Sequence, residues 1–341
     1  MLREPIEGFM LELRSGHIFE VKGLVHPPGR VLAYPRYVLD PAGPRLRAGR
    51  AFRKLSSWAE RMAFLREHFS YYLTFDPVLG DKFCEVPLTD VARVLDPVGG
   101  LSKLSKSPRS DLAISALEMA DELRDRAGLA QHEVGVSGSL LVGLEEPSSD
   151  IDLVIYGREA CIRAYGALKA MREEGMTKPL GPGELRAVWL ARSKDTPYEA
   201  CDFFSREPGK GEPGKVLQGI FRGKPYSIRL VPSTGPEPYG RRKFRSLGTA
   251  AIRARVEDAS DSIFTPCRYL ITDIEVLEGP RSPVPNVLAS FRMRFCEHLK
   301  EGEAFEARGK LEAVFSPKGL EEVRLLVGGR PGDYVKPLRA L

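Results

Sequence analysis

The chain has 341 residues, of which 43% are hydrophobic, and its 51 Lys and Arg against 46 Asp and Glu leave a formal net charge of +5. This composition excludes a disordered chain and is typical of a folded protein with two or three domains. No apolar run is long enough for a transmembrane helix, and the N-terminal residues lack the layout of a signal peptide, so we expect a cytoplasmic protein with no membrane partner.

The cysteine and amide contents give two further expectations. The cysteines show no pair or Cys/His cluster with zinc-ligand spacing, so we expect buried apolar side chains at Cys84, Cys161, Cys201, Cys267 and Cys296. Asn286 is the only asparagine, and glutamine occurs only at Gln131 and Gln218. Because labile amides are depleted in proteins from thermophiles, the sequence predicts a thermophilic source.

Residues 1–108 form the first compositional zone, which we predict to be a small α/β domain of unknown role. Strand-like segments at 17–22 and 30–34 are split by a Pro-Pro-Gly turn signal. Ser57 is a suitable cap for a helix whose apolar residues recur at three- and four-residue spacing. The segment 88–95 resembles a further short helix that ends at an Asp-Pro pair.

Residues 109–240 form the second zone, in which predicted helices and strands alternate. An amphipathic helix over 111–128 precedes a strand, a helix start, a second strand and a helix over 158–174. This order favours an α/β (α+β) sheet with a site at its strand ends. Short helices at 184–191 and 198–204 and a hairpin of 216–221 with 226–231 are predicted to complete the zone.

Residues 241–341 form the third zone, which reads as strands divided by turns. The expected strands are 250–256, 267–271, 287–294, 305–311 and 322–327. Strands at such regular intervals favour a small β-barrel-like domain, reached through a linker near 235–243.

The stretch from Val134 to Tyr156 carries the chemistry of the chain. Gly138 and Ser139 can open a helix whose free N–H groups would face a phosphate. Asp150 and Asp152 alternate on a strand and would therefore point to the same side of the sheet. Two carboxylates beside a phosphate cradle are what a divalent metal bridging to a nucleoside triphosphate requires.

This arrangement resembles the signature of the polymerase-beta-type nucleotidyltransferase superfamily. The resemblance lies in Gly138-Ser139 with Gly143 on the following helix, and in the strand that opens with Ser149-Asp150-Ile-Asp152. It covers residues 110–232 and implies a nucleotidyltransferase fold for the central domain. It also implies an enzyme that moves a nucleoside monophosphate from a triphosphate to a hydroxyl on RNA, a protein or a small molecule.

The resemblance also implies roles for individual residues. Gly138 and Ser139 would hold the nucleotide phosphates, the glycine by letting the backbone approach and the serine by donating from its hydroxyl. Asp150 and Asp152 would be the catalytic carboxylates and would coordinate Mg²⁺ or Mn²⁺. Ser149 would orient the first aspartate or contact phosphate, and Arg229 would act as a phosphate clamp or stand as an exposed strand cation.

The family's third carboxylate has no evident counterpart in this sequence. In the best-placed strand, Ser227-Ile-Arg-Leu-Val231, Arg229 stands where an acid is expected. Glu199 and Asp202 lie upstream and are alternative acids. If neither serves, the same fold would bind a nucleotide or RNA as a catalytically inactive module.

A basic run offers a separate route to nucleic acid. It includes Arg222, Lys224, Arg229, Arg241, Arg242, Lys243, Arg245, Arg253 and Arg255. The run is either a solvated face or a contact for phosphate or an RNA backbone. With a C-terminal barrel, it leaves open a third function, that of an RNA-binding protein with a vestigial nucleotide site.

Overall fold

The computed structural model describes residues 4–193, 195 and 215–338. The chain divides into two compact units. The first unit comprises Met1–Tyr72, Cys84–Arg186 and Glu207–Pro236, and the second comprises Leu73–Phe83, Ala187–Arg206 and Glu237–Leu341. Most of the first two zones of the sequence thus lies in one unit, and the boundary at 236/237 lies within the predicted linker.

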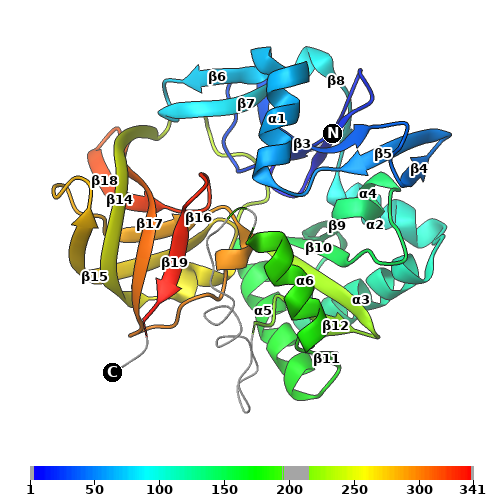
Figure 1. Ribbon diagram of the computed structural model, residues 1–341. Coiled ribbons are helices and arrows are strands. Elements are labelled where there is room, and N and C mark those ends of the chain that lie inside the picture. The colour runs from blue at the N-terminus through cyan, green and yellow to red at the C-terminus, as the bar shows by residue number, and fades with distance from the viewer. Residues whose placement is uncertain (1–3, 194, 196–214, 339–341) are drawn as a thin grey trace. The chain divides into compact units, whose positions relative to one another are not determined.

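The N-terminal part of the first unit is a mixed α and β structure built on one large sheet (Figure 1). Its main path runs in the order β4-β5-β3-β2-β1-β8, with β7 also paired to β3 and β6 to β7. The strands are β1 (Met10–Leu13), β2 (Ile18–Val21), β3 (Arg30–Leu39), β4 (Arg45–Arg47), β5 (Arg50–Lys54), β6 (Leu73–Asp76), β7 (Asp81–Pro87) and β8 (Val91–Leu95). Of these, β6 and the first residues of β7 belong to the second unit.

The predicted N-terminal helix is present and begins where its cap predicts. Helix α1 (Trp58–His68) has Ser57 as its N-cap, and the Ser57 hydroxyl accepts from the Glu60 amide at 3.2 Å. The Glu60 carboxylate accepts from the Ser57 amide at 2.8 Å, which completes a capping box. The predicted helix at 88–95 is wrong: Leu88–Asp90 is one 3₁₀ turn, and β8 pairs with β1, because edge pairing satisfies more backbone than a short helix would.

The central part of the first unit has the predicted order of elements. Helices α2 (Pro97–Lys106) and α3 (Asp111–Ala127) precede β9 (Val134–Val136), α4 (Gly138–Val142), β10 (Ile151–Tyr156) and α5 (Arg158–Glu173). β11 (Thr177–Lys178), α6 (Pro182–Arg192), β12 (Gln218–Phe221) and β13 (Lys224–Val231) follow, and the predicted β12–β13 hairpin is confirmed. The predicted helix at 198–204 lies outside the described residues.

The central sheet is mixed and is covered on both faces. Its order is β11-β12-β13-β10-β9, in which β10 and β13 are parallel and the other pairs are antiparallel. Helices α3 and α5 pack against each other and on β10. On the opposite face, Val154 and Tyr156 meet the N-terminal segment at Gly8, and the Tyr156 hydroxyl donates to the Glu7 carbonyl at 3.1 Å. The N-terminal segment therefore forms part of the central domain.

The second unit contains a ring of paired strands. β14 (Lys243–Asp258), β15 (Cys267–Glu278), β16 (Val287–Ser290), β18 (Gly319–Leu326) and β17 (Ala304–Ser316) pair in that order, and β17 pairs back to β14. β16 and β18 are parallel, and β19 (Tyr334–Pro337) adds to β17. Each of the five predicted strands overlaps one of these observed strands. Closure of the ring leaves few unpaired backbone groups at its edges.

Two expectations about composition can be compared with the described residues. The cysteines described by the structure are free and buried, as predicted, whereas Cys201 lies outside the described residues. Among the helices of the described chain, none has the length and apolarity needed to span a membrane.

Candidate functional site

The predicted phosphate turn and the predicted metal ligands lie together in the structure. Gly138 opens α4 with a positive φ of 60°, and a Cβ at this position would overlap the Asp152 carboxylate. The Ser137 amide donates to the Asp152 carbonyl at 2.8 Å, which fixes the turn to the start of β10. Only glycine accommodates both the left-handed backbone and the approach of the carboxylate. The sequence spacing therefore brings Gly138 and Asp152 into contact.

The first backbone N–H groups of α4 receive no side-chain cap, because the residue that would supply it bonds elsewhere. Ser137 is the N-cap residue, yet its side chain makes no cap hydrogen bond. Its hydroxyl instead donates to the Gly8 carbonyl at 2.8 Å. The first N–H groups of a helix have no partner within the helix, so they stay available to an acceptor. Ser139 is buried within this turn, with 3% of its surface exposed.

Asp150 and Asp152 carry charge that the protein does not fully neutralise. Within the described residues, the Asp150 carboxylate has no hydrogen-bond or ion-pair partner. Asp152 accepts from the Ser227 hydroxyl at 2.5 Å, and the two residues are register partners in the parallel β10–β13 pair. Burial and the nearby Asp150 charge raise the pKa of Asp152 to about 6. Such a shift is what an uncompensated pair of acids produces, and a bound cation would reverse it.

The N-terminal sheet places a cation, Lys54, near this pair of acids, a proximity that the sequence did not predict. Lys54, at the end of β5, is half-buried and has no ion pair within the described part of the chain. Burial and Arg36 lower the pKa of Lys54, while Asp150 and Asp152 act in the opposite direction. No local pattern marks Lys54 in the sequence, because its position depends on the pairing of β5 with β3.

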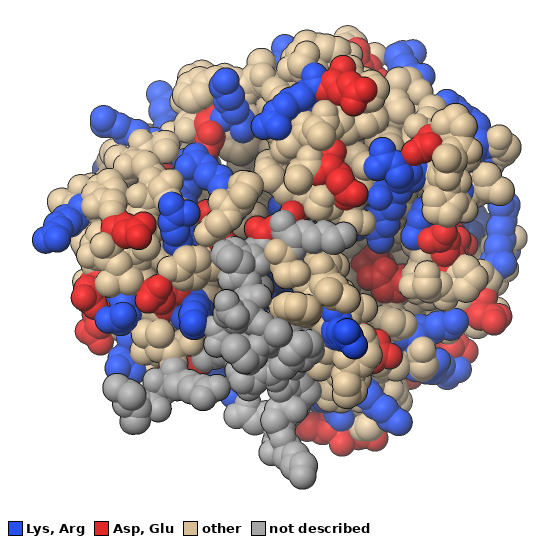
Figure 2. All heavy atoms as spheres, in the orientation of Figure 1, with Lys and Arg blue, Asp and Glu red and all other residues tan. Residues whose placement is uncertain are grey.

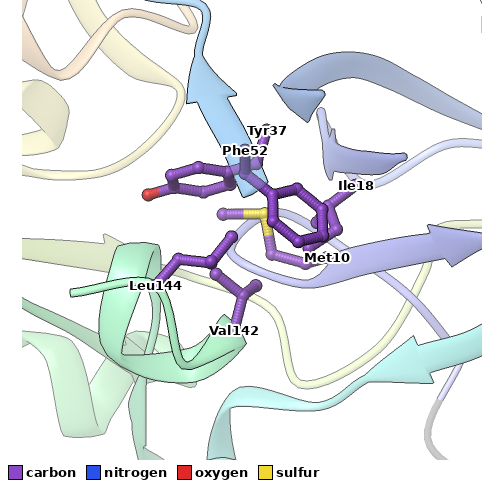
Figure 3. Close-up of a cluster of buried hydrophobic side chains, with 6 residues drawn as sticks. All are labelled: Met10, Ile18, Tyr37, Phe52, Val142 and Leu144. Atoms are coloured by element: carbon purple, nitrogen blue, oxygen red, sulfur yellow. The ribbon is translucent and has the colours of Figure 1, made fainter. Parts of the chain in front are cut away.

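A shared hydrophobic cluster holds the N-terminal sheet against the phosphate turn (Figure 3). Met10, Ile18, Tyr37 and Phe52 come from the sheet, and Val142 and Leu144 come from the end of α4 and the residues after it. Since Tyr37 is the register partner of Lys54, the packing of Tyr37 against this cluster also positions Lys54. Burial raises the pKa of Tyr37 to about 12, so its hydroxyl stays protonated at neutral pH.

Arginines of β4 hold the C-terminal end of α4. Arg47 donates to the Val142 carbonyl at 3.1 Å, and Arg45 donates to the Leu144 carbonyl. Arg45 also pairs with Glu146 at 2.6 Å. Cations at helix C-terminal carbonyls are stabilising, so these contacts fix the short helix that presents Gly138 and Ser139.

The remaining predicted phosphate contacts, Ser149 and Arg229, have partners inside the protein. The buried Ser149 hydroxyl accepts from the Glu146 amide at 2.9 Å and so shapes the loop before Asp150. Arg229 pairs with Glu7 and lies 3.6 Å from Glu20. Its contact with phosphate stays a prediction, although two acids already neutralise much of its charge.

The register of the sheet assigns Ser227, rather than Arg229, to the position beside Asp152. Arg229 is the register partner of Val154, two residues farther along β10. Because residues two apart share a face, Ser227 and Arg229 point to the same side. Within the described residues, no group of three or more His, Cys, Asp or Glu side chains is placed to hold a metal ion. The alternative acids, Glu199 and Asp202, lie outside the described residues.

Comparisons with known proteins give one relative and no assigned function. The chain is 29% identical over 335 residues to the uncharacterized protein MJ1086 of Methanocaldococcus jannaschii, a match that covers 93% of this chain and 94% of the relative. No family model matches the chain, and no solved structure matches it.

Proposed function

We propose that the chain is a metal-dependent nucleotidyltransferase of the polymerase-beta type, which transfers a nucleoside monophosphate from a nucleoside triphosphate to a hydroxyl acceptor. The observation that carries this proposal is the contact between Gly138 and the Asp152 carboxylate. That contact brings a turn with free amide donors directly beside Asp152, and carboxylates are ligands that bind divalent metal ions. A triphosphate needs both features at once, since its oxygens accept from amides and share a cation with carboxylates.

The donor set fits one divalent cation of the hard, oxygen-preferring kind. Asp150 and Asp152 would hold Mg²⁺ or Mn²⁺, and the unsatisfied Asp150 carboxylate and the raised pKa of Asp152 both favour a bound cation. When bound, such an ion neutralises charge on the phosphates during transfer. The fit is to a single ion, because the described residues supply two carboxylates at this position.

The chain's own residues would orient the nucleotide. The amides at the start of α4 and the Ser139 hydroxyl would donate to phosphate oxygens. Lys54 would place a positive charge near the two acids, where the triphosphate adds negative charge. Ser227 would hold Asp152 in one rotamer through its 2.5 Å hydrogen bond.

A second candidate function is an inactive nucleotide- or RNA-binding module, and one observation favours it. Ser227 occupies the strand position beside Asp152, and a serine is a poor base for activating an acceptor hydroxyl. The phosphate turn would remain competent for binding. The two candidates therefore share a ligand and differ in turnover.

Label transfer distinguishes the candidates. Protein would be incubated with nucleoside triphosphates labelled at the α-phosphate, Mg²⁺ or Mn²⁺, and mixed RNA, protein and small-molecule acceptors. We expect transfer that falls by at least about 100-fold in Asp150→Asn and Asp152→Asn, the size of effect seen when one catalytic electrostatic group is removed. Asp121→Asn, at an aspartate with a 67% exposed side chain, is the matched control.

The outcomes separate cleanly when binding is measured in parallel. Transfer that persists in both aspartate variants would contradict the assigned roles. Binding of triphosphate without any transfer would favour the inactive module. Absence of both binding and transfer would exclude the nucleotide site altogether.

A further inference from the structure

The second unit contains a cleft of about 580 Å³ that has no part in the nucleotide site. It is lined by Phe75, Pro77, Gly80, Lys243, Phe244, Arg245, Ser246 and Phe315. Aromatic rings and cations thus share one cavity, and the cations belong to the basic run of the sequence. A volume of this size accommodates a flat aromatic group of a ligand.

The walls of the cleft are fixed to each other by the backbone. The Phe244 amide donates to the Val78 carbonyl at 2.7 Å, which ties β14 to the turn between β6 and β7. Gly80 packs so closely on the Phe244 carbonyl that a Cβ would overlap it. The buried Asp76 carboxylate accepts from the Val78 and Leu79 amides, at 2.8 Å each, and holds the turn. The cleft is therefore formed before any ligand binds.

Phe75 offers the free ring of the cleft. Its side chain is 62% exposed, although a large apolar ring gains free energy from burial. Phe244 differs, because the Arg324 guanidinium lies 4.7 Å from its ring centroid. Phe75 is thus the ring on which a further planar group can stack.

Lys243 and Arg245 are exposed and lack acidic partners within the described residues. Their neighbour Arg242 is different, since it pairs with Glu321 at 2.9 Å. On the face shown in Figure 2, basic and acidic side chains are interspersed rather than gathered by sign. An attraction for anions at this cleft therefore comes from these two unpaired cations and not from the net charge of the chain.

We propose that this cleft binds single-stranded nucleic acid, with one base stacked on Phe75 and adjacent phosphates contacting Lys243 and Arg245. A base supplies a planar ring and its backbone supplies anions at short intervals, which is the combination that the cleft presents. An acidic peptide would satisfy the cations alone, and it is an alternative that the experiment tests. The proposal does not depend on nucleotidyl transfer in the first unit.

Fluorescence anisotropy with a labelled twelve-nucleotide oligouridine, the matching oligodeoxythymidine and a polyglutamate peptide tests the proposal on the full chain. We expect Phe75→Ala to weaken RNA binding by about 10-fold, and Phe75→Leu to weaken it nearly as much because the ring is lost. Lys243→Ala with Arg245→Ala should weaken binding and reduce the salt slope by about 1.4, that is about 0.7 for each phosphate contact.

Arg281→Ala is the matched control, since Arg281 is an exposed cation of the same unit that does not line the cleft. It should bind as the unmodified chain does, and thermal melting should verify that every variant is folded. Equal loss in the control, unchanged binding in Phe75→Ala, equal binding of polyglutamate, or no binding at all would each overturn the proposal. Phe75→Ala should leave binding of nucleoside triphosphate unchanged, so failure here is distinguishable from failure of the nucleotidyltransferase proposal. The DNA arm shows whether the sugar is recognised.

Discussion

Ser227 and Arg229 are neighbours on one face of β13, but the acids beside Arg229 are paired with cations and those beside Ser227 are not. Beside Ser227, the carboxylates of Asp152 and Asp150 form no ion pair with a cation of the described residues. At Arg229, the fully buried Glu7 side chain and Glu20 pair with Arg229, Lys22 and Arg61 in one network. Both lie on the same face of one sheet, so burial alone does not explain the difference.

The pKa values of two acids express this difference. Burial would raise the pKa of Glu20, but Lys22 and Arg61 outweigh it and hold that pKa well below its usual range. Burial and Asp150 raise the pKa of Asp152 instead. The charges around Arg229 are compensated by ion pairs, whereas the carboxylates of Asp150 and Asp152 form no ion pair within the described residues. Unneutralised charge is therefore the better marker of a site.

The largest effect is expected from breaking the compensated network. Glu7→Ala removes the fully buried partner of Arg229 and Lys22 and leaves Glu20 alone to balance both cations. Removal of one member of a buried ion pair costs about 3–5 kcal/mol of unfolding free energy. Urea denaturation measures the loss. Glu275→Ala, which removes an exposed pair with Arg253, should change stability by less than about 1 kcal/mol. Equal losses in the two variants would remove the contrast between buried and exposed pairs.

The next effect is expected at the turn that meets Asp152. Gly138→Ala combines a left-handed backbone with the overlap at the carboxylate, whereas Gly128→Ala, at φ 56°, has open space around the added Cβ. We expect about 1–2 kcal/mol of destabilisation in Gly128→Ala and roughly twice that in Gly138→Ala, because only the latter displaces a neighbour. Thermal and urea unfolding measure the loss of stability in both variants. A smaller loss in Gly138→Ala than in Gly128→Ala would show that the Asp152 side chain moves aside at little cost.

A pH series should separate the two acids. The pKa of Asp152 is about 6 in the folded chain against an ordinary 3.8, so the folded state holds the proton more tightly. Its contribution to stability is therefore present below pH 4 and is lost as pH rises through 6. Asp152→Asn should be more stable than the unmodified chain at pH 8, by about 1–3 kcal/mol, and should show no gain at pH 4. Glu20 has the opposite sign, since its stabilisation is present above pH 4.5 and is lost on acidification.

Added Mg²⁺ sharpens the pH experiment. A cation bound by Asp150 and Asp152 stabilises their charged forms, so it should raise the melting temperature of the unmodified chain at pH 8 and leave Asp152→Asn unchanged. An equal rise in both proteins would mean that the ion binds elsewhere.

The smallest effect is expected at Lys54. Lys54→Ala removes a half-buried cation near both acids, and we expect nucleoside triphosphate to bind about 10-fold more weakly, as for the loss of one charged hydrogen bond. Lys54→Arg should recover much of the affinity because it keeps the charge. Isothermal titration with a non-hydrolysable triphosphate measures both variants. Unchanged affinity in Lys54→Ala would show that the N-terminal sheet does not contribute to binding.

The local parts of the site could be predicted from the sequence. Gly138 and Asp152 are close in the chain, so a turn, a short helix and a strand suffice to bring them together. The order of helices and strands around them follows from periodicity and caps, as Ser57 at α1 and Gly128 after α3 illustrate.

The distant parts could not be predicted. Lys54 is placed by the pairing of β5 with β3, and Glu7 meets Arg229 from a turn that precedes β1. No local pattern encodes such long-range contacts. Ser227 was within reach, because it shares a face with Arg229, yet choosing between them requires the register of β10 against β13. The segment 88–95 could not be predicted for the same reason, because its strand forms only by pairing with β1.

The Glu7–Arg229 contact has a consequence for biosynthesis. Glu7 and Arg229 are 222 positions apart in the chain. A ribosome adding about 5–20 residues per second exposes Glu7 some tens of seconds before it releases Arg229. During that interval the nascent sheet carries a buried acid without its main counter-ion. The N-terminal part of the chain would then wait in an incomplete form, and its contact with β13 would form only late in synthesis.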